Sequence, residues 1–465
     1  MYSLDWLYRV FDGARDRDFI VWREQSFSYA WLLEHIESWK SRIAAANIAR
    51  GTVVAVEGDY SPEVIALLLA LIDTGCIVVP LAGSSATQRE EFKSIAEVQA
   101  AICFSEGDRF DIVSYDRAVE NALNHKLIAM GDPGLVLFSS GSTGKSKAAL
   151  HNFARLLEKF QVRRNCLITL TMLLLDHIGG LNTLFYVLSN AGTIVAVDNR
   201  DPEQICSAIA RHQVELLPTS PTFLNLLLIS EAWKRHNLSS LRRVTYGTEV
   251  MPARTLQRLH EILPNVDLLQ TYGLSELGIL RSKSRSPDSL WVKVGGEGVE
   301  TKVEHGTLRI RTRSAMIGYL NAPSPFDDEG WFDTGDNVEV DGEFLRILGR
   351  KSEVINVGGE KVFPVEVENV LLDMPNVSDV TVSAMPNPIT GQVVTARFNL
   401  FEPEELPAFR RRMREFCAAR LTPYKVPAKI EIVNDAQYGE RFKKMRRGNP
   451  AAAPIQSSEA AQQTE

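Results

Sequence analysis

The sequence predicts an α/β protein with a large N-terminal domain of layered α/β subdomains, a small β-barrel-like part and a small α+β C-terminal domain. Three observations predict this fold class. Apolar β-branched runs alternate with amphipathic helical stretches through most of the chain. After Ser289, polar and apolar residues alternate with glycines between them, and after the segment near residue 350 strand-like and helix-like stretches follow one another in a compact α+β pattern. A chain of 465 residues is long enough for such a division.

In the first part, strand candidates at residues 52–58, 76–81, 100–104 and 192–198 are separated by helix candidates such as 28–46 and 201–214. Short β-branched runs between helical patterns are typical of largely parallel sheets. The most hydrophobic segment, residues 64–83, contains Asp73, Gly75 and Pro80. These interruptions indicate a core helix, a glycine turn and a buried strand rather than a membrane span.

Residues 290–320 alternate polar and apolar side chains, which predicts a β-meander or a small barrel. Residues 336–350 predict a hairpin that turns at Asp341-Gly342. Two strands and one amphipathic helix are then expected between residues 377 and 421. The predicted domains are residues 1–351 and 352–447, and residues 448–465 are expected to form a disordered tail because they lack apolar periodicity.

The composition is that of an ordinary globular protein, with 45% hydrophobic and 23% charged residues and a net charge of −7. This balance argues against general attraction to nucleic acid or to an anionic membrane. Five scattered cysteines without a CxxC pair indicate buried, reduced thiols rather than a metal site. The N-terminus has no apolar h-region, so we expect no signal peptide and a cytoplasmic location.

The stretch LFSSGSTGKSKAAL, residues 137–150, has the composition of a phosphate-binding loop. Its glycines allow backbone N–H groups to turn toward an anion, and its hydroxyls and lysines add donors and charge. Only two residues separate Gly141 from Gly144, so the four-residue spacing of a Walker loop is absent. A Ser/Gly-rich linker is the alternative interpretation of this stretch alone.

Together with four later stretches, this loop resembles the signatures of the adenylate-forming superfamily, in that family's order. The family contains acyl- and aryl-CoA synthetases, adenylation domains of peptide synthetases and luciferase. The other matching stretches are QTYGLSELG at 270–278, GWFDTGD at 330–336, LGRKSEVINVGGEKVFPVEVE at 348–368 and ERFKKMRR at 440–447. The resemblance implies ATP and Mg²⁺ as cofactors and a C-terminal domain that is mobile.

The resemblance also assigns expected roles to individual residues. Ser139, Ser140, Gly141, Ser142, Thr143, Gly144 and Lys147 would bind the ATP phosphates. Tyr272, beside Gly273, would stack on adenine, with a core tyrosine as the alternative. Ser275 would contact the α-phosphate, Glu276 would hold Mg²⁺, and Asp336 with Arg350 would bind the ribose hydroxyls.

Three further positions are candidates for contact with the substrate. The resemblance implies that Lys443 meets the reacting carboxylate, with Lys444 in reserve; Phe442 replaces the family's usual glycine before this lysine. His177 matches a residue near the acyl pocket, with a core histidine as the alternative. Asp176 either caps a helix or faces a basic group of the substrate.

The resemblance implies a hinge near Ser352, where the family more often has Asp or Lys. The expected reaction converts a carboxylic acid and ATP to acyl-AMP and pyrophosphate and then transfers the acyl group to CoA. The alternatives are the phosphopantetheine thiol of a carrier protein acting in trans, an amine acceptor, or a relative that binds nucleotide without catalysis. Tyr246, Thr248 and Glu249 suggest a modest, partly polar pocket for an aryl or short to medium acyl acid, and Glu249 and Asp176 leave room for an amino group on it.

Overall fold

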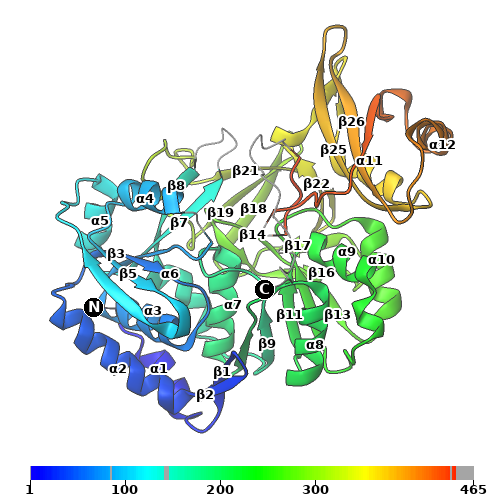
Figure 1. The fold of residues 1–465 in the computed structure, drawn as a ribbon. Coiled ribbons are helices and arrows are strands. Elements are labelled where there is room, and N and C mark those ends of the chain that lie inside the picture. Colours follow the sequence, from blue (N-terminus) through cyan, green and yellow to red (C-terminus); the bar gives the residue numbers. More distant parts are fainter. Residues whose placement is uncertain (1, 84–85, 141–145, 440–441, 447–465) are drawn as a thin grey trace, which may run out of the picture. The chain divides into compact units, whose positions relative to one another are not determined.

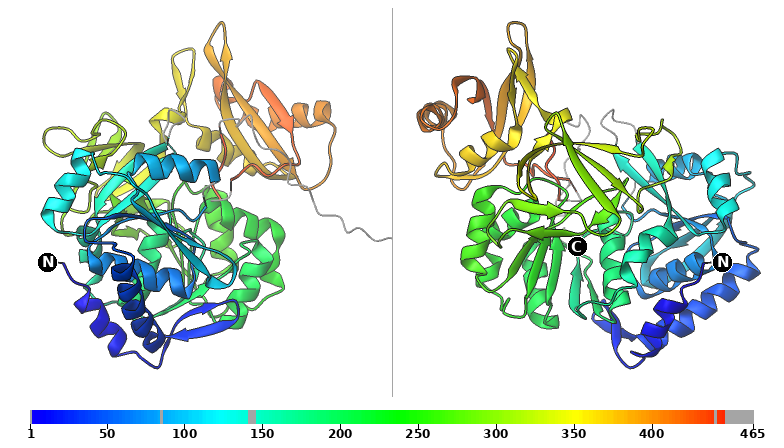
Figure 2. Two further views of the ribbon diagram at one scale, coloured as in Figure 1. Left: turned by 60° about the vertical axis from the view of Figure 1, so that its left-hand side comes forward. Right: turned by 180° about the vertical axis from the view of Figure 1, so that it is seen from behind.

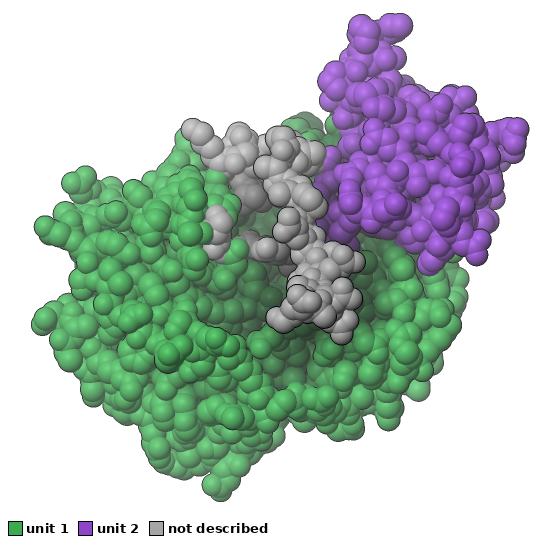
Figure 3. All heavy atoms as spheres, in the orientation of Figure 1, with its two compact units in different colours: residues 1–354 green, residues 355–465 purple. Residues whose placement is uncertain are grey.

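The computed structural model describes residues 2–83, 86–140, 146–439 and 442–446. The chain divides into two compact units, residues 1–354 and 355–465, which Figure 3 colours separately. The sequence places the domain boundary after Lys351, and the structure divides the chain three residues later, after Val354. The predicted C-terminal tail, residues 448–465, lies outside the described residues.

Within the described part of unit 1, two sheets of seven strands form the main layers (Figure 1). The first has the order β20 (Gly318–Tyr319), β8 (Ser146–Asn152), β7 (Gly134–Ser140), β4 (Ile77–Pro80), β3 (Val53–Glu57), β5 (Ala100–Phe104) and β6 (Phe110–Ser114). The second has the order β13 (Asp267–Gln270), β12 (Arg243–Tyr246), β11 (Leu216–Thr219), β9 (Ile168–Thr171), β10 (Thr193–Ala196), β1 (Asp18–Trp22) and β2 (Gln25–Ser28). The central strands of both sheets pair in parallel, as predicted.

Helices cover both faces of the first sheet because its strands are apolar on both sides. Val54, Val56 and Val78 belong to one core cluster with α2 (Tyr29–Ala45), α3 (Pro62–Thr74) and α7 (Ile178–Ser189). The alternate residues Val53 and Ala55 pack in a second cluster with α4 (Ala86–Ile95) and α5 (Ala122–Met130). This two-residue alternation is the pleat of a fully buried strand.

Local signals explain where these helices begin and end. Ser28 and Ser61 accept backbone hydrogen bonds as N-caps of α2 and α3, and Gly75 ends α3 with a φ of 84°. The segment read as core helix, glycine turn and buried strand is therefore confirmed. Among the described residues, no helix is both long and apolar enough to cross a membrane.

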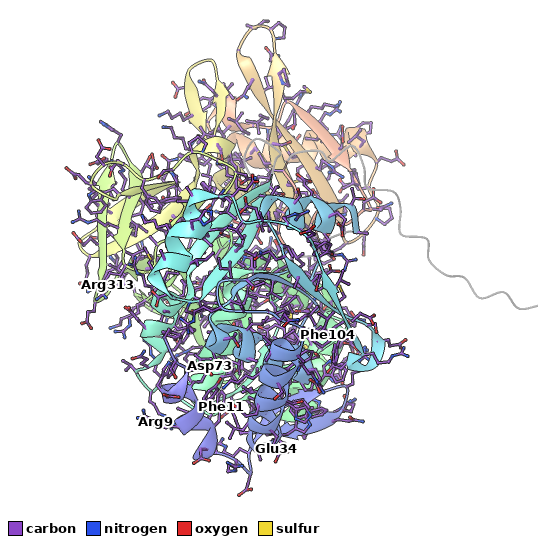
Figure 4. The ribbon with its side chains drawn as sticks, turned by 90° about the vertical axis from the view of Figure 1, so that its left-hand side faces the viewer. Arg9, Phe11, Glu34, Asp73, Phe104 and Arg313 are labelled. Carbon is purple, nitrogen blue, oxygen red and sulfur yellow. The ribbon has the colours of Figure 1, made fainter. Side chains whose placement is uncertain are left out.

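The end of α3 also joins the first helices of the chain. Asp73 accepts a hydrogen bond from the Leu4 N–H at 3.0 Å and pairs with Lys40 of α2 at 2.6 Å. Figure 4 labels Asp73 and the fully buried Phe11 of α1 (Asp5–Asp12) in this region. The remaining helices of unit 1 are α6 (Phe153–Leu157), α8 (Pro202–His212), α9 (Pro221–Ser230) and α10 (Ala253–Ile262), with short 3₁₀ turns at Glu106–Asp108, Glu158–Phe160, Ala232–Lys234 and Lys351–Glu353.

The segment after Ser289 contributes to an antiparallel sheet of six strands in the described region (Figure 2). Its order is β16 (Ser282–Ser284), β17 (Trp291–Val294), β22 (Phe344–Arg350), β21 (Phe332–Asp341), β19 (Thr307–Thr312) and β18 (Val299–Glu304). The turn of the β21–β22 hairpin lies one residue later than predicted: Asp341 pairs with Phe344, and Gly342 with a φ of 59° begins the two-residue loop. A separate hairpin, β14 (Tyr272–Leu274) and β15 (Gly278–Leu280), carries the QTYGLSE stretch.

Unit 2 has the predicted α+β composition. Its strands are β23 (Ile355–Val357), β24 (Glu360–Val362), β25 (Val377–Asn387), β26 (Gly391–Leu400) and β27 (Lys429–Ile432). Helices α11 (Pro364–Leu372) and α12 (Leu406–Ala418) and the 3₁₀ turn Pro423–Lys425 complete its described elements. Val380, Phe398 and Phe409 are fully buried in its own core, so unit 2 has an independent hydrophobic interior.

Candidate active site

Asp336 is a buried carboxylate held between two strands and a hairpin. It lies on β21 opposite Arg350 of β22 and is only 6% exposed. Its Oδ2 accepts a hydrogen bond from the Tyr272 hydroxyl at 2.6 Å, and its Oδ1 accepts one from the Arg350 Nε at 3.2 Å. Burial raises the pKa of Asp336, while the Arg350 charge and the Tyr272 hydroxyl oppose the rise. The neighbouring Asp333 is exposed, and its side chain accepts a hydrogen bond from the Gly335 N–H at 2.9 Å.

Tyr272 packs in the core of the six-stranded sheet region, together with Leu277 and Phe332. Because it is 5% exposed and its hydroxyl is used by Asp336, its position agrees with the core-tyrosine alternative; its stacking on adenine remains a prediction. Gly273 is required by the hairpin itself, since a Cβ there would lie 2.5 Å from Ile279 Cδ1 and 2.7 Å from the Gly278 carbonyl oxygen.

Glu276 lies in the loop between β14 and β15 and contacts a tyrosine that sequence analysis did not select. The Tyr319 hydroxyl donates to Glu276 Oε1 at 2.6 Å, and Lys147 Nζ lies 5.1 Å from the centre of the Tyr319 ring. Glu276 also acts electrostatically on Arg350. The structure therefore brings Lys147, Glu276, Tyr272, Asp336 and Arg350 into two linked clusters within unit 1.

Two more residues outside the motifs support the same hairpin. His151 of β8 is fully buried, and its Nε2 lies 2.6 Å from the Ser275 carbonyl oxygen. Burial lowers the pKa of His151 to about 4, so near neutral pH the ring is uncharged and Nε2–H donates. Lys159 Nζ donates to the Ile279 carbonyl at 2.6 Å, and burial lowers the pKa of this amine to about 7. No local pattern pointed to these contacts, because the partners are 124 and 120 residues apart.

The phosphate-loop residues are described at both edges of the loop. Ser139 on β7 pairs with Lys147 on β8, and Ser140 pairs with Ser146. These antiparallel partners place Lys147 beside the end of the strand that enters the loop. Gly141, Ser142, Thr143 and Gly144 lie outside the described residues.

His177 is the N-cap of α7, and its Nδ1 accepts a hydrogen bond from the Gly179 N–H at 3.0 Å. The helix-cap alternative for Asp176 is therefore wrong. Asp176 is 5% exposed, and its Oδ2 accepts from the Gly83 N–H at 3.0 Å. His177 takes the cap because its own ring nitrogen reaches the first turn. Its role at an acyl pocket remains a prediction.

The proposed pocket residues Tyr246, Thr248 and Glu249 lie at the end of β12 and in the segment that follows it. Tyr246 is 1% exposed, and Thr248 has a φ of 74°, which is uncommon for a residue other than glycine. Glu249 accepts hydrogen bonds from the Thr222 N–H, at 3.0 Å, and from the Thr222 hydroxyl. The Glu249 carboxylate thus binds the first turn of α9, where negative charge is stabilising.

In unit 2 the two candidate lysines have different surroundings. Lys444 donates to the Val380 carbonyl at 2.6 Å and pairs with Asp379 at 3.0 Å, with both side chains at most 10% exposed. Lys443 is exposed. Phe442 has a φ of 48°, which lies in the left-handed region that favours glycine. Ser352 lies in the 3₁₀ turn Lys351–Glu353, directly before the division between the units.

The described residues fit a magnesium ion that takes most of its ligands from a nucleotide. No group of three or more His, Cys, Asp or Glu side chains in the described ranges forms a metal site. Glu276 offers a hard carboxylate oxygen near Lys147 and Arg350, and Mg²⁺ is commonly bound by one or two carboxylates together with substrate phosphates. The five cysteines carry free thiols; Cys76, Cys206 and Cys417 are buried as predicted, whereas Cys103 and Cys166 are half-buried.

Known proteins resemble the chain over nearly its whole length. The indoleacetate–CoA ligase of Aromatoleum aromaticum is 27% identical, with 93% of this chain and 94% of that protein covered. The 2-succinylbenzoate–CoA ligase of Bacillus subtilis is 25% identical, with 92% and 94% covered. Among solved structures, an anthranilate CoA ligase, AuaEII, bound to anthranoyl-AMP has a TM-score of 0.82 at 19% identity, with 95% of each chain covered. The o-succinylbenzoate CoA synthetase of Bacillus subtilis bound to its acyl-adenylate has a TM-score of 0.75 at 21% identity, with 95% and 96% covered.

Two family models also match. Residues 7–320 match the AMP-binding enzyme model and residues 366–443 match the AMP-binding enzyme C-terminal domain. The first match spans most of unit 1 and includes Lys147, Tyr272, Glu276 and Tyr319, and the second covers most of the described part of unit 2. The chain therefore belongs to the AMP-binding enzymes, the adenylate-forming superfamily.

Proposed function

We propose that this protein is an acid–thiol ligase that activates an aryl or short to medium acyl carboxylic acid with ATP and transfers the acyl group to CoA. The observation that carries the proposal is the pair of linked clusters in unit 1. One contains Asp336, Arg350 and Tyr272, and the other contains Lys147, Tyr319 and Glu276. They combine a buried carboxylate for ribose hydroxyls with a cation and a metal-binding carboxylate for phosphates.

In the first half-reaction, a carboxylate oxygen of the acid attacks the α-phosphorus of ATP and the bond to pyrophosphate breaks. The acid is already ionised near pH 7, so the chain needs no general base. Its residues orient the nucleotide and neutralise charge instead. Bound Mg²⁺ would neutralise negative charge on the phosphate oxygens.

Each cluster has one part of this task. Asp336 accepts hydrogen bonds from the ribose, and Arg350 keeps the carboxylate oriented through its Nε contact of 3.2 Å. Lys147, with Ser139 and Ser140 on the paired strand, binds phosphate together with Gly141, Ser142, Thr143 and Gly144. Glu276 would hold Mg²⁺, and Ser275 would contact the α-phosphate.

Lys443 supplies the cation for the reacting carboxylate. The choice of Lys443 over Lys444 is supported by burial. Lys444 forms a buried ion pair with Asp379 inside unit 2, whereas the Lys443 side chain is exposed. In the second half-reaction the sulfur of CoA attacks the acyl carbonyl and a thioester bond forms. The bond between the acyl carbon and the phosphate oxygen breaks, AMP leaves, and the thiol proton passes to solvent.

The substrate class follows from relatives and from the pocket side chains. The named CoA ligases of indoleacetate and 2-succinylbenzoate act on aryl acids. Asp176 and Glu249 each accept a hydrogen bond from a backbone N–H group, and a carboxylate has further lone pairs that accept from an amino group. The proposed substrate class therefore includes aryl acids with and without an amino group, with His177 at the acyl pocket.

The test measures pyrophosphate release with a panel of aryl, amino-aryl and acyl acids, each with and without CoA. Release that CoA accelerates, with acyl-CoA identified by mass, supports the ligase and names the acid. Accumulation of acyl-AMP that CoA does not affect would instead favour a carrier-protein thiol or an amine. The absence of release with every acid would contradict the proposal.

A further inference from the structure

Residues 316–321 form a short segment, here called the strap, that binds the strand carrying Lys147. The Ile317 N–H donates to the Leu150 carbonyl at 2.7 Å, and the Leu320 N–H donates to the Ala148 carbonyl at 2.9 Å. The Asn321 side chain accepts from the Ala148 N–H and donates to the Ser146 carbonyl, both at 2.9 Å. The strap therefore binds β8 on both sides of Lys147 along the chain.

The same strap binds the loop that carries Glu276. The Met316 N–H donates to the Glu276 carbonyl at 2.7 Å, and the Tyr319 hydroxyl donates to Glu276 Oε1 at 2.6 Å. Backbone and side chain of Glu276 are thus both held by one segment. Since the strap is also paired with β8, its geometry sets where Glu276 lies relative to Lys147.

Tyr319 is well suited to hold a carboxylate. It is 7% exposed, and Lys147 Nζ lies 5.1 Å from its ring centre, within the range of a cation–π interaction. A hydrogen bond from a hydroxyl to a carboxylate is among the stronger ones in proteins.

We propose that Tyr319 is a positioning residue that fixes the Glu276 carboxylate relative to Lys147, so that Glu276 can bind magnesium while Lys147 binds the ATP phosphates. The inference rests on the proposed function, in which Glu276 holds the metal. Without the hydroxyl, Glu276 would remain in its loop through the Met316 contact, but its side chain would lose the contact that selects one rotamer. Metal–nucleotide binding then weakens, while the fold persists.

The experiment compares Tyr319→Phe with Tyr29→Phe as the matched control. Tyr29 is fully buried in unit 1, and its hydroxyl donates to the Gly192 carbonyl at 2.7 Å, so both variants lose one buried hydroxyl. Binding of Mg²⁺ and ATP is measured by calorimetry with no carboxylic acid present, at several free Mg²⁺ concentrations. Melting temperature and the Mg²⁺ dependence of pyrophosphate release complete the comparison.

Y319F is expected to raise the Mg²⁺ concentration for half-maximal ATP binding about tenfold, the effect of losing one hydrogen bond to a charged group. Y29F is expected to lower the melting temperature without changing this concentration. Equal Mg²⁺ dependence in Y319F, Y29F and the unaltered protein would overturn the inference. In the Y319F/E276Q double variant, the two effects should not add, because both act through one carboxylate; full additivity would also overturn it.

The variant Glu276→Gln separates this inference from the proposed function. If E276Q weakens the Mg²⁺-dependent binding and Y319F does not, the metal role of Glu276 stands and the positioning role of Tyr319 is refuted. If E276Q itself leaves the Mg²⁺ dependence unchanged, the metal assignment in the proposed function fails, and the inference fails with it.

Discussion

Replacing His151 with glutamine should change how the stability of unit 1 depends on pH. His151 is fully buried and bonds to the Ser275 carbonyl at 2.6 Å. Burial lowers its pKa from an ordinary 6.5 to about 4. Glutamine has an amide N–H at nearly the same reach, so His151→Gln can keep a donor to Ser275 while removing the titrating group.

The sign of the effect follows from proton binding in the two states. Between pH 6.5 and about 4, the unfolded chain binds a proton at His151 and the folded chain does not. The free energy of unfolding therefore falls as pH falls through this range. A tenfold difference in proton affinity corresponds to about 1.4 kcal/mol, so the full loss from this residue is about 3 kcal/mol.

Urea unfolding followed by tryptophan fluorescence is the suitable assay, because all seven tryptophans lie in residues 1–354 and report on unit 1. Unfolding curves at about pH 7.5 and about pH 4.5 are compared for the unaltered protein and H151Q. Carboxylates titrate in both proteins and cancel in the difference. The variant should gain about 2.5 kcal/mol relative to the unaltered protein on acidification. Stability curves that stay parallel across this range would refute the buried, neutral histidine.

Three further predictions concern the two units. Asp336→Asn should raise the Kd for ATP at least tenfold, since one carboxylate oxygen that accepts a hydrogen bond is lost. The control is Asp333→Asn, at an exposed position on the same strand, which should leave the Kd for ATP unchanged. Equal effects of the two substitutions would contradict the ribose role of Asp336. Lys443→Ala should slow single-turnover pyrophosphate release at least a hundredfold without destabilising unit 2. Lys444→Ala should instead leave the Asp379 carboxylate buried without its ion-pair partner. The free energy of unfolding of unit 2, measured by hydrogen exchange, should then fall by about 3 kcal/mol. Phe442→Gly should leave unit 2 more stable than Phe442→Ala by about 1 kcal/mol in the same measurement, because the φ of 48° disfavours a residue with a Cβ. A glycine variant that is less stable than the alanine variant would exclude backbone strain at this position.

Much of the fold was predictable because its signals are local. Residues 28–46 begin with the serine that caps α2, and residues 201–214 begin with the aspartate that caps α8. The apolar segment 64–83 contains the glycine that ends α3 and the strand that follows. In each case neighbouring residues decide the backbone conformation, so a linear pattern is enough.

The candidate site was predictable to the extent that its residues lie in recognisable stretches. Asp336 and Arg350 were both expected at the ribose, and the structure pairs them across β21 and β22. For Asp176 the sequence left a helix cap and a contact with the substrate open, and the structure gives the N-cap of α7 to the next residue, His177. Such a one-residue difference depends on packing around the helix, to which the local pattern is insensitive.

The sequence by itself determined that the protein has two α/β-type units and carries the phosphate-loop, hairpin and hinge stretches of an adenylate-forming enzyme. Only the tertiary structure decided that Tyr319 holds Glu276 and His151 holds Ser275, and that Lys444 forms a buried ion pair with Asp379. The physical reason is separation along the chain. Partners 43 and 124 residues apart meet through strand pairing and buried hydrogen bonds, and no periodicity or cap within either segment encodes the other.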